Sequence, residues 1–236
     1  MVFSSVEELV AAAAPATCIE GDTIIVVGAP PPELIDRLAQ TSAFGATPEI
    51  KGAVRWVIRS LAVAKGVRPA SIHELYLAMG KGKVGGFTVP AMNLRMMTYD
   101  TARAVFRAAK ACSAGASIFE IARSEIGYTE QRPHEYAASV LAAALREGHT
   151  GPVFIQGDHV QVNAKKYASP DRNKELETLR GLIREEIAEL QRLVEEAGDQ
   201  GVPDDDPAVI GYLRELLARN ELVEELEELD RLRRGA

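Results

Sequence analysis

The sequence predicts an α/β protein built from parallel βα units, with a helical leader before them and an acidic helical tail after them. Three apolar, strand-like runs begin at Phe87, Ala116 and Val153, and each is followed by an amphipathic helical pattern. Strands that are apolar on both faces and alternate with helices are typical of a parallel sheet covered by helices. We therefore expect three βα units in residues 86–190.

Residues 1–85 are predicted to form the helical leader. A short hairpin is expected from residues 17–19 and 23–27, turning at Gly21. Three helices should follow: one after the prolines at 30–32, one from about Pro48 to Lys65, and one that ends near Met79. Ser71, with Glu74 three residues later, predicts a capping box at the start of the last helix.

The three predicted units share one design, in which a short apolar strand leads into a longer helix. The strands are expected at Phe87–Leu94, Ala116–Ile121 and Val153–Gln156, and the helices at Tyr99–Ala111, at Pro133–Arg146 and through Leu179 and Leu182. Proline suits the first turn of the second helix because its missing N–H has no partner there.

Residues 191–236 are predicted to be an acidic helical tail, in which a linker at Gly198–Pro207 precedes two leucine-rich helices. Residues 171–236 carry 19 acidic and 10 basic side chains, so most of the negative charge of the chain lies there. This charge disfavours nucleic acid and anionic membranes as partners. The sequence has two cysteines without paired spacing, no run long enough to span a membrane and no basic leader, and these features favour the cytoplasm.

Polar side chains stand at the end of each predicted strand, where α/β sheets carry their chemistry. These are Asn93 and Arg95, then Arg123, Ser124 and Glu125, then Asp158 and His159. A neutral histidine is a metal ligand, and a neighbouring aspartate is a candidate proton carrier. A zinc site needs three or four ligands, but the 77 residues after His159 contain neither histidine nor cysteine.

Several stretches of the chain resemble the class II, zinc-dependent fructose-bisphosphate aldolases, in particular a longer bacterial branch with a helical leader. The stretches are residues 88–93, 98–104, 119–125 and 156–159, with residues 71–76 of the leader fitting the same branch. The resemblance implies a TIM barrel in which zinc polarises the carbonyl of a ketose phosphate. It also implies a sugar-phosphate substrate and a homo-oligomer.

By position, the resemblance makes His159 the first zinc ligand and Asp158 the acid/base at the breaking bond. It places Asn93 and Ser124 in the substrate pocket, and Glu125, beside Ser124 at the same strand end, is a further candidate for that pocket. The family takes its other zinc histidines, a catalytic glutamate and its glycine-rich phosphate loops from later strands, and this sequence has none of those motifs. We therefore expect a partial TIM barrel and an incomplete zinc site.

Simpler interpretations remain open for the same residues. Glu125 could pair with Arg123 or Arg132 at the surface, and Asn93 could be a turn-former before Thr98, a candidate helix cap. The three other histidines suit structural positions. A second functional hypothesis is a non-catalytic barrel fragment that acts as a self-association or binding module.

Overall fold

The computed structural model describes residues 2–20 and 23–199. The predicted tail falls largely outside this range, since residues 200–236, with most of the linker and both leucine-rich helices, are not among the described residues. Gly198, which was expected to open the linker, still belongs to the last helix, which ends at Asp199.

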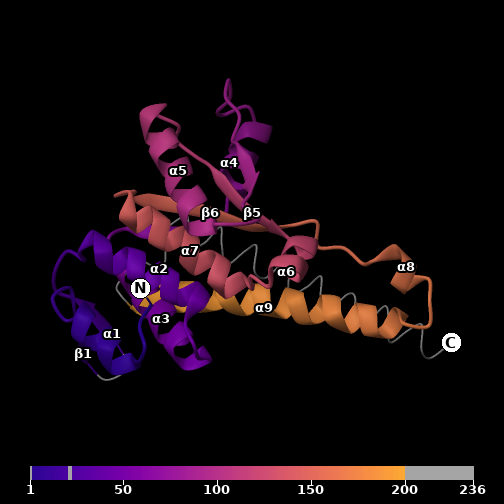
Figure 1. Ribbon diagram of the computed structural model, residues 1–236. Helices are drawn as coiled ribbons and strands as arrows, with labels where there is room; N and C mark the ends of the chain where they lie inside the picture. Colours follow the sequence, from indigo (N-terminus) through magenta and orange to yellow (C-terminus); the bar gives the residue numbers. More distant parts are fainter. Residues whose placement is uncertain (1, 21–22, 200–236) are drawn as a thin grey trace.

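The predicted hairpin and helices of the leader are present (Figure 1). The strands β1 and β2 pair antiparallel, with Thr17 opposite Val26. Helix α3 begins as its sequence predicts, because the hydroxyl of Thr47 accepts a hydrogen bond from the backbone N–H of Ile50 at 3.3 Å and Pro48 fills the first turn. The elements are α1 (Val6–Ala13), β1 (Thr17–Glu20), β2 (Thr23–Val26), α2 (Pro32–Phe44), α3 (Pro48–Ala64) and α4 (His73–Gly80).

The leader and the βα units together form a parallel sheet of four strands, rather than the expected three. Its strands are β3 (Val67–Ala70), β4 (Ala91–Asn93), β5 (Ile118–Ala122) and β6 (Gly151–Asp158), in the order β3-β6-β5-β4. The additional strand, β3, comes from the leader and pairs with the first half of β6. Strand β4 is shorter than predicted: it begins at Ala91, opposite Ile118, the first residue of β5, and the segment from Phe87 precedes that pairing.

The helices that follow the strands match the predicted pattern, with two additions. Helices α5 (Thr98–Ala111), α7 (Pro133–Arg146) and α9 (Arg172–Asp199) were expected, whereas the short α6 (Arg123–Thr129) and α8 (Ala164–Tyr167) were not. Helix α6 begins directly after β5, ahead of the helix predicted at Pro133–Arg146. The three polar residues predicted at the end of this strand, which are Arg123, Ser124 and Glu125, therefore lie in its first turn.

Two predicted caps differ from the structure. The N-cap of α4 is Ile72, and the Ser71 hydroxyl accepts its hydrogen bond from the N–H of His73 at 3.1 Å, so the capping box with Glu74 does not form. Thr98 is the first residue of α5 rather than its cap. Its hydroxyl donates instead to the side-chain oxygen of Gln131 at 2.6 Å, which joins α5 to the segment between α6 and α7.

Helix α7 lies at the centre of the hydrophobic core. Every residue from Tyr136 to Ala144 is buried, and this alanine-rich stretch lets α2, α3 and α5 approach closely. On the sheet side, Phe106 of α5 packs on Phe119 of β5, with 5.1 Å between ring centroids. The buried cluster extends from Phe3 in the leader to Leu182 in α9, so the leader and the βα units share one core.

A polar network also joins the leader to the βα units. The carboxylate of Asp36 in α2 accepts hydrogen bonds from the Tyr99 hydroxyl in α5 and from the Arg146 guanidinium in α7 at 2.9 Å. Burial raises the pKa of Asp36, but these two donors outweigh it, and the pKa lies below its usual range. The charged carboxylate thus fastens α2 to two helices of the later units.

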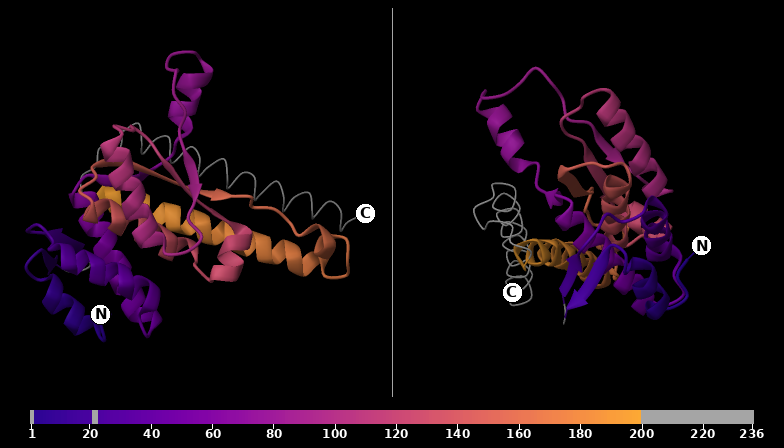
Figure 2. Two further views of the ribbon diagram at one scale, coloured as in Figure 1. Left: turned by 45° about the horizontal axis from the view of Figure 1, so that its top comes forward. Right: turned by 90° about the vertical axis from the view of Figure 1, so that its left-hand side faces the viewer.

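Helix α4 stands apart from this packing and projects beyond the sheet (Figures 1 and 2). None of its residues is buried, although Tyr76 and Leu77 are apolar. In the part of the chain that the structure describes, no helix is both long and apolar enough to cross a bilayer.

Candidate functional site

The carboxyl ends of β4, β5 and β6 bring together residues that are far apart in the sequence. The strands are parallel and adjacent, with Asn93 opposite Glu120 and Ala122 opposite Asp158. The ends of neighbouring parallel strands meet at one edge of a sheet. Asn93 and Asp158 therefore lie within hydrogen-bond distance although 65 positions separate them.

The side-chain amide of Asn93 links two carboxylates at this edge. Its nitrogen donates to Asp158 Oδ2 at 3.0 Å and to Glu125 Oε2 at 3.1 Å. Glu125 Oε2 also accepts from the backbone N–H of Ala122 at 2.8 Å, and its Oε1 accepts from Arg95 Nε at 2.6 Å. We call Asn93, Arg95, Glu125 and Asp158 the strand-end cluster.

Glu125 is the buried anchor of the strand-end cluster, with 4% of its surface exposed. Burial raises the pKa of its carboxyl, but hydrogen bonds from Ala122, Asn93 and Arg95 outweigh the burial, and the pKa lies below its ordinary value. Glu125 is thus a charged acceptor at neutral pH. Its surface pairing with Arg123 or Arg132, considered from the sequence, is replaced by burial and by pairing with Arg95.

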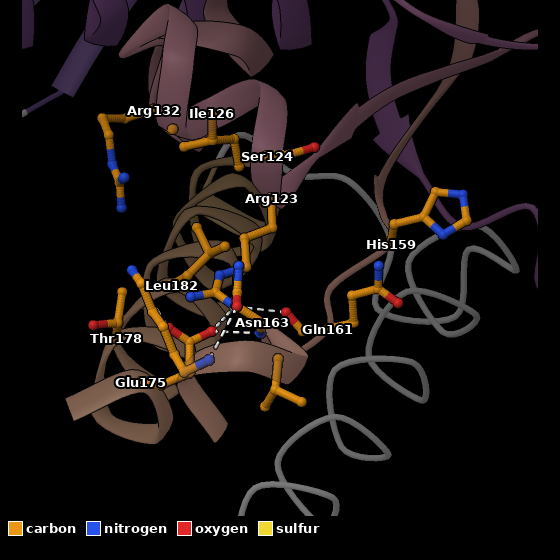
Figure 3. Close-up of a pocket in the computed structure, with 13 residues that line it drawn as sticks. Arg123, Ser124, Ile126, Arg132, His159, Gln161, Asn163, Glu175, Thr178 and Leu182 are labelled. Atoms are coloured by element: carbon orange, nitrogen blue, oxygen red, sulfur yellow. Dashed lines mark hydrogen bonds and ion pairs between the residues drawn. The ribbon is translucent and has the colours of Figure 1, made fainter. Parts of the chain in front are cut away.

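His159 follows β6 directly and lies beside Asp158. Its Nε2 is 3.4 Å from Asp158 Oδ1, and its side chain is 73% exposed. The backbone at His159 has φ +50°, a left-handed conformation that is uncommon for a residue other than glycine and is found at functional sites and turns. Figure 3 shows the imidazole pointing away from the Arg123–Glu175 pair.

A cavity of about 390 Å³ adjoins the cluster between α6, the segment after β6, and α9. Ser124 and His159 belong to its wall, together with Arg123, Asn163 and Glu175 (Figure 3). The structure therefore divides the five residues predicted from the sequence. Asn93, Glu125 and Asp158 belong to the strand-end cluster, Ser124 lines the cavity, and His159 lines the cavity and lies beside Asp158.

The described residues do not fit a complete zinc site. Within residues 2–20 and 23–199, no group of three or more histidine, cysteine, aspartate or glutamate side chains is arranged to hold a metal ion. The Asn93 amide directs its donor nitrogen, which is no metal ligand, at Asp158. His149 lies at the opposite end of β6, where its Nε2 is 3.2 Å from the carbonyl oxygen of Pro152. The imidazole of His159 is thus a single exposed ligand.

Sequence reasoning missed one residue of this region and underrated two others. Arg95 and Arg123 were recognised only as polar residues at strand ends, yet both hold buried carboxylates. Glu175 was missed because it lies on α9, 52 positions after Arg123, and only the folded chain brings them together. A glutamate at an apolar position of an amphipathic helix was the one available hint.

Comparison with known proteins finds no match for this chain among protein-family models, curated proteins or solved structures.

Proposed function

We propose that the strand-end cluster belongs to an aldehyde-lyase site of the class II fructose-bisphosphate aldolase type, present here as the front portion of that site. The substrate class is a ketose phosphate, cleaved reversibly between two carbons. Asp158 is the acid/base, Asn93 and Ser124 contact the substrate, and Glu125 fixes Asn93.

One observation carries this proposal: the Asn93 amide bonds to both Asp158 and Glu125 at the carboxyl ends of adjacent parallel strands. Three residues that the sequence predicts for one site are thereby in contact. Sheets of this kind bind ligands at that edge. The remaining residues, Ser124 and His159, share the neighbouring cavity wall.

Asp158 can carry the proton that aldol cleavage requires. One quarter of its side chain is exposed, and Asn93 holds Oδ2 in place. In the cleavage direction, the carboxylate takes the proton from the hydroxyl next to the breaking bond. An aldehyde forms there, the carbon–carbon bond breaks, and its electron pair passes to the carbonyl fragment as an enediolate. Protonation of that fragment then gives the second product.

His159 is proposed to contribute one ligand to a zinc ion whose other ligands lie outside the described residues or on another chain. A single exposed imidazole binds metal weakly, because structural and catalytic zinc sites use at least three protein ligands. We expect substoichiometric zinc that is lost in His159→Ala. Atomic absorption measures the zinc content of the purified wild-type chain and of the variant.

The activity is tested with pure protein, Zn²⁺ and fructose 1,6-bisphosphate, with triose phosphate as the measured product. Triose phosphate should form at high protein concentration, and Asp158→Asn should lower the rate roughly a hundredfold or more by removing the acid/base. Asp171→Asn is the matched control, since Asp171 is exposed and belongs to neither the strand-end cluster nor the cavity wall. Absence of product from the wild-type chain removes the proposed activity.

We further propose that the sheet is the opening part of a TIM barrel. The strands β4, β5 and β6 are parallel and adjacent in chain order, and a helix connects each to the next, as in a barrel. In such a barrel the next strand would pair with β6. Here β3 from the leader occupies part of that edge.

A second candidate function is self-association without catalysis, in which a second copy of the chain is the partner. A hollow of about 730 Å³ beside α5 is lined by Phe44, Met96, Met97 and Tyr128, each more than 60% exposed. Large exposed apolar patches are typical of interaction surfaces. Light scattering tests this function, which requires a dimer or larger assembly: a monomer at all concentrations contradicts it, whereas triose phosphate release by an assembly favours the aldolase proposal. Neither function involves nucleic acid or a membrane.

A further inference from the structure

The segment that carries His159 has no regular secondary structure. It leaves β6 after Asp158, turns at His159 through a left-handed backbone conformation and reaches α8 at Ala164. The ring of His159 is largely exposed, so packing contributes little to its position. The place of the imidazole therefore depends on how the backbone of residues 159–163 is held.

Two side chains from other elements hold this backbone (Figure 3). Arg123 Nη1, at the start of α6, donates to the carbonyl oxygen of Gln161 at 2.6 Å. Glu175 Oε1, in α9, accepts from the backbone N–H of Asn163 at 2.6 Å. The same oxygen accepts from Arg123 Nη1 at 2.6 Å, so the two side chains form one unit with contacts two and four residues after His159.

The Arg123–Glu175 pair is buried and charged. The Glu175 side chain is 1% exposed, and that of Arg123 is 18% exposed. Hydrogen bonds from Arg123 and from the Asn163 backbone hold the pKa of Glu175 at about 2. The ammonium of Lys166 lies 4.0 Å from the other carboxylate oxygen. A buried charge of this kind persists only where donors surround it, so the surrounding backbone is fixed with it.

We propose that Arg123 and Glu175 are positioning residues, which hold residues 159–163 so that His159 stays beside Asp158. The contribution of His159 to a metal site rests on the function proposed above, whereas the fixing of the segment does not.

A second buried ion pair links α9 to another helix. Arg59 Nη1 lies 3.7 Å from Glu189 Oε1, and both side chains are at most 6% exposed. This pair joins α3 to α9, within the layer of helices. The Arg123–Glu175 pair differs because its members also bond to the main chain of the segment after β6. Substitution of Glu189 therefore provides a control for lost stability alone.

The experiment compares three full-length variants with the wild-type chain: Glu175→Gln, Arg123→Met and the control Glu189→Gln. The first readout is hydrogen exchange of the Asn163 amide, relative to the core amide of Leu141. The second is the rate of trypsin cleavage after Lys165 and Lys166. The third is titration with Zn²⁺ alone.

Glu175→Gln and Arg123→Met should each raise Asn163 exchange and trypsin cleavage about tenfold, the factor expected for one lost charge-assisted hydrogen bond. The affinity for Zn²⁺ should fall by roughly tenfold or more, as it does when other residues that hold a metal ligand in position are substituted. Glu189→Gln should leave Asn163 exchange and trypsin cleavage unchanged, even if faster exchange of the Leu141 amide shows that overall stability is lower.

The proposal is overturned if Glu175→Gln and Arg123→Met expose the segment no more than Glu189→Gln does. Because Glu175→Gln preserves side-chain shape, it also provides a folded variant should Arg123→Met unfold. A wild-type chain that binds no Zn²⁺ and releases no triose phosphate refutes the proposed function. The exchange data still decide whether the pair fixes the segment.

Discussion

Replacing the Asn93 amide with a carboxylate tests the arrangement of the strand-end cluster most directly. The change Asn93→Asp keeps the shape of the side chain but replaces the donor between Asp158 and Glu125 with a third negative group. The two contacts measure 3.0 and 3.1 Å in the wild-type chain, so the new carboxyl takes a place beside both carboxylates.

The expected loss of stability follows from the two hydrogen bonds that the Asn93 amide donates. A bond to a charged group contributes about 1.5–3 kcal/mol. The bond to buried Glu125 is counted in full, whereas Asp158 is partly exposed and water can replace its donor. Repulsion between like charges adds to the loss. We expect Asn93→Asp to lower the free energy of unfolding by about 3 kcal/mol at pH 7.5, within the stability of an ordinary domain.

The pH dependence has a defined sign. Two neighbouring carboxylates raise the pKa of the new carboxyl in the folded chain above its value of about 3.9 in the unfolded chain. The destabilisation is therefore present at neutral pH and shrinks as the pH falls towards about 4, since the folded chain then keeps the proton.

Urea unfolding at pH 7.5 and pH 4.5, followed by circular dichroism, measures both effects. The control Asn173→Asp makes the same chemical change at an exposed position near the start of α9, where a negative charge is tolerated or slightly favourable. A loss below about 0.5 kcal/mol for Asn93→Asp, the range of ordinary surface substitutions, without pH dependence, would show that Asn93 does not stand between two carboxylates.

Three further predictions concern other polar contacts. Because the pKa of Glu175 is held at about 2, its contribution to stability is present above pH ~4.3 and lost as the pH falls towards 2. In Glu175→Gln, the urea midpoint of unfolding should therefore decrease less between pH 5 and pH 3 than in the wild-type chain. Tyr136→Phe should lower stability by about 1–2 kcal/mol, since the buried hydroxyl donates to the Glu120 carbonyl at 2.6 Å; an unchanged midpoint contradicts that bond. Asp36→Asn should lower stability by about 1–2 kcal/mol, because it weakens the bonds to Tyr99 and Arg146. Tyr99→Phe should then destabilise the Asp36→Asn chain less than it destabilises the wild-type chain.

The sequence predicted those parts of the fold that local patterns determine. Helix α7 was placed from Pro133 to Arg146, as observed, because proline marks its start and its apolar positions repeat with helical spacing. The strand-end residues were located for the same reason, since each follows an apolar run. Local patterns also predicted the hairpin of the leader.

What the sequence did not predict depends on partners that are distant in the chain. The four residues of β3 include Pro69, which weakens any strand signal, and the strand exists because β6 pairs with it. Proline is tolerated there because β3 is an edge strand. The predicted start of β4 at Phe87 was too early because β5 provides no partner before Ile118. Likewise, Glu175 has a role only through Arg123 and Asn163.

The position of β3 also limits how the site around His159 can be completed. Strand β3 pairs with β6 from Gly151 to Phe154, and β5 covers the other edge of β6 as far as Asp158. Among the described residues, the edge of β6 from Ile155 to Asp158 on the β3 side has no strand partner. Side chains that complete a site at His159 must therefore come from this open side or from above the strand ends, because β5 already occupies the other side.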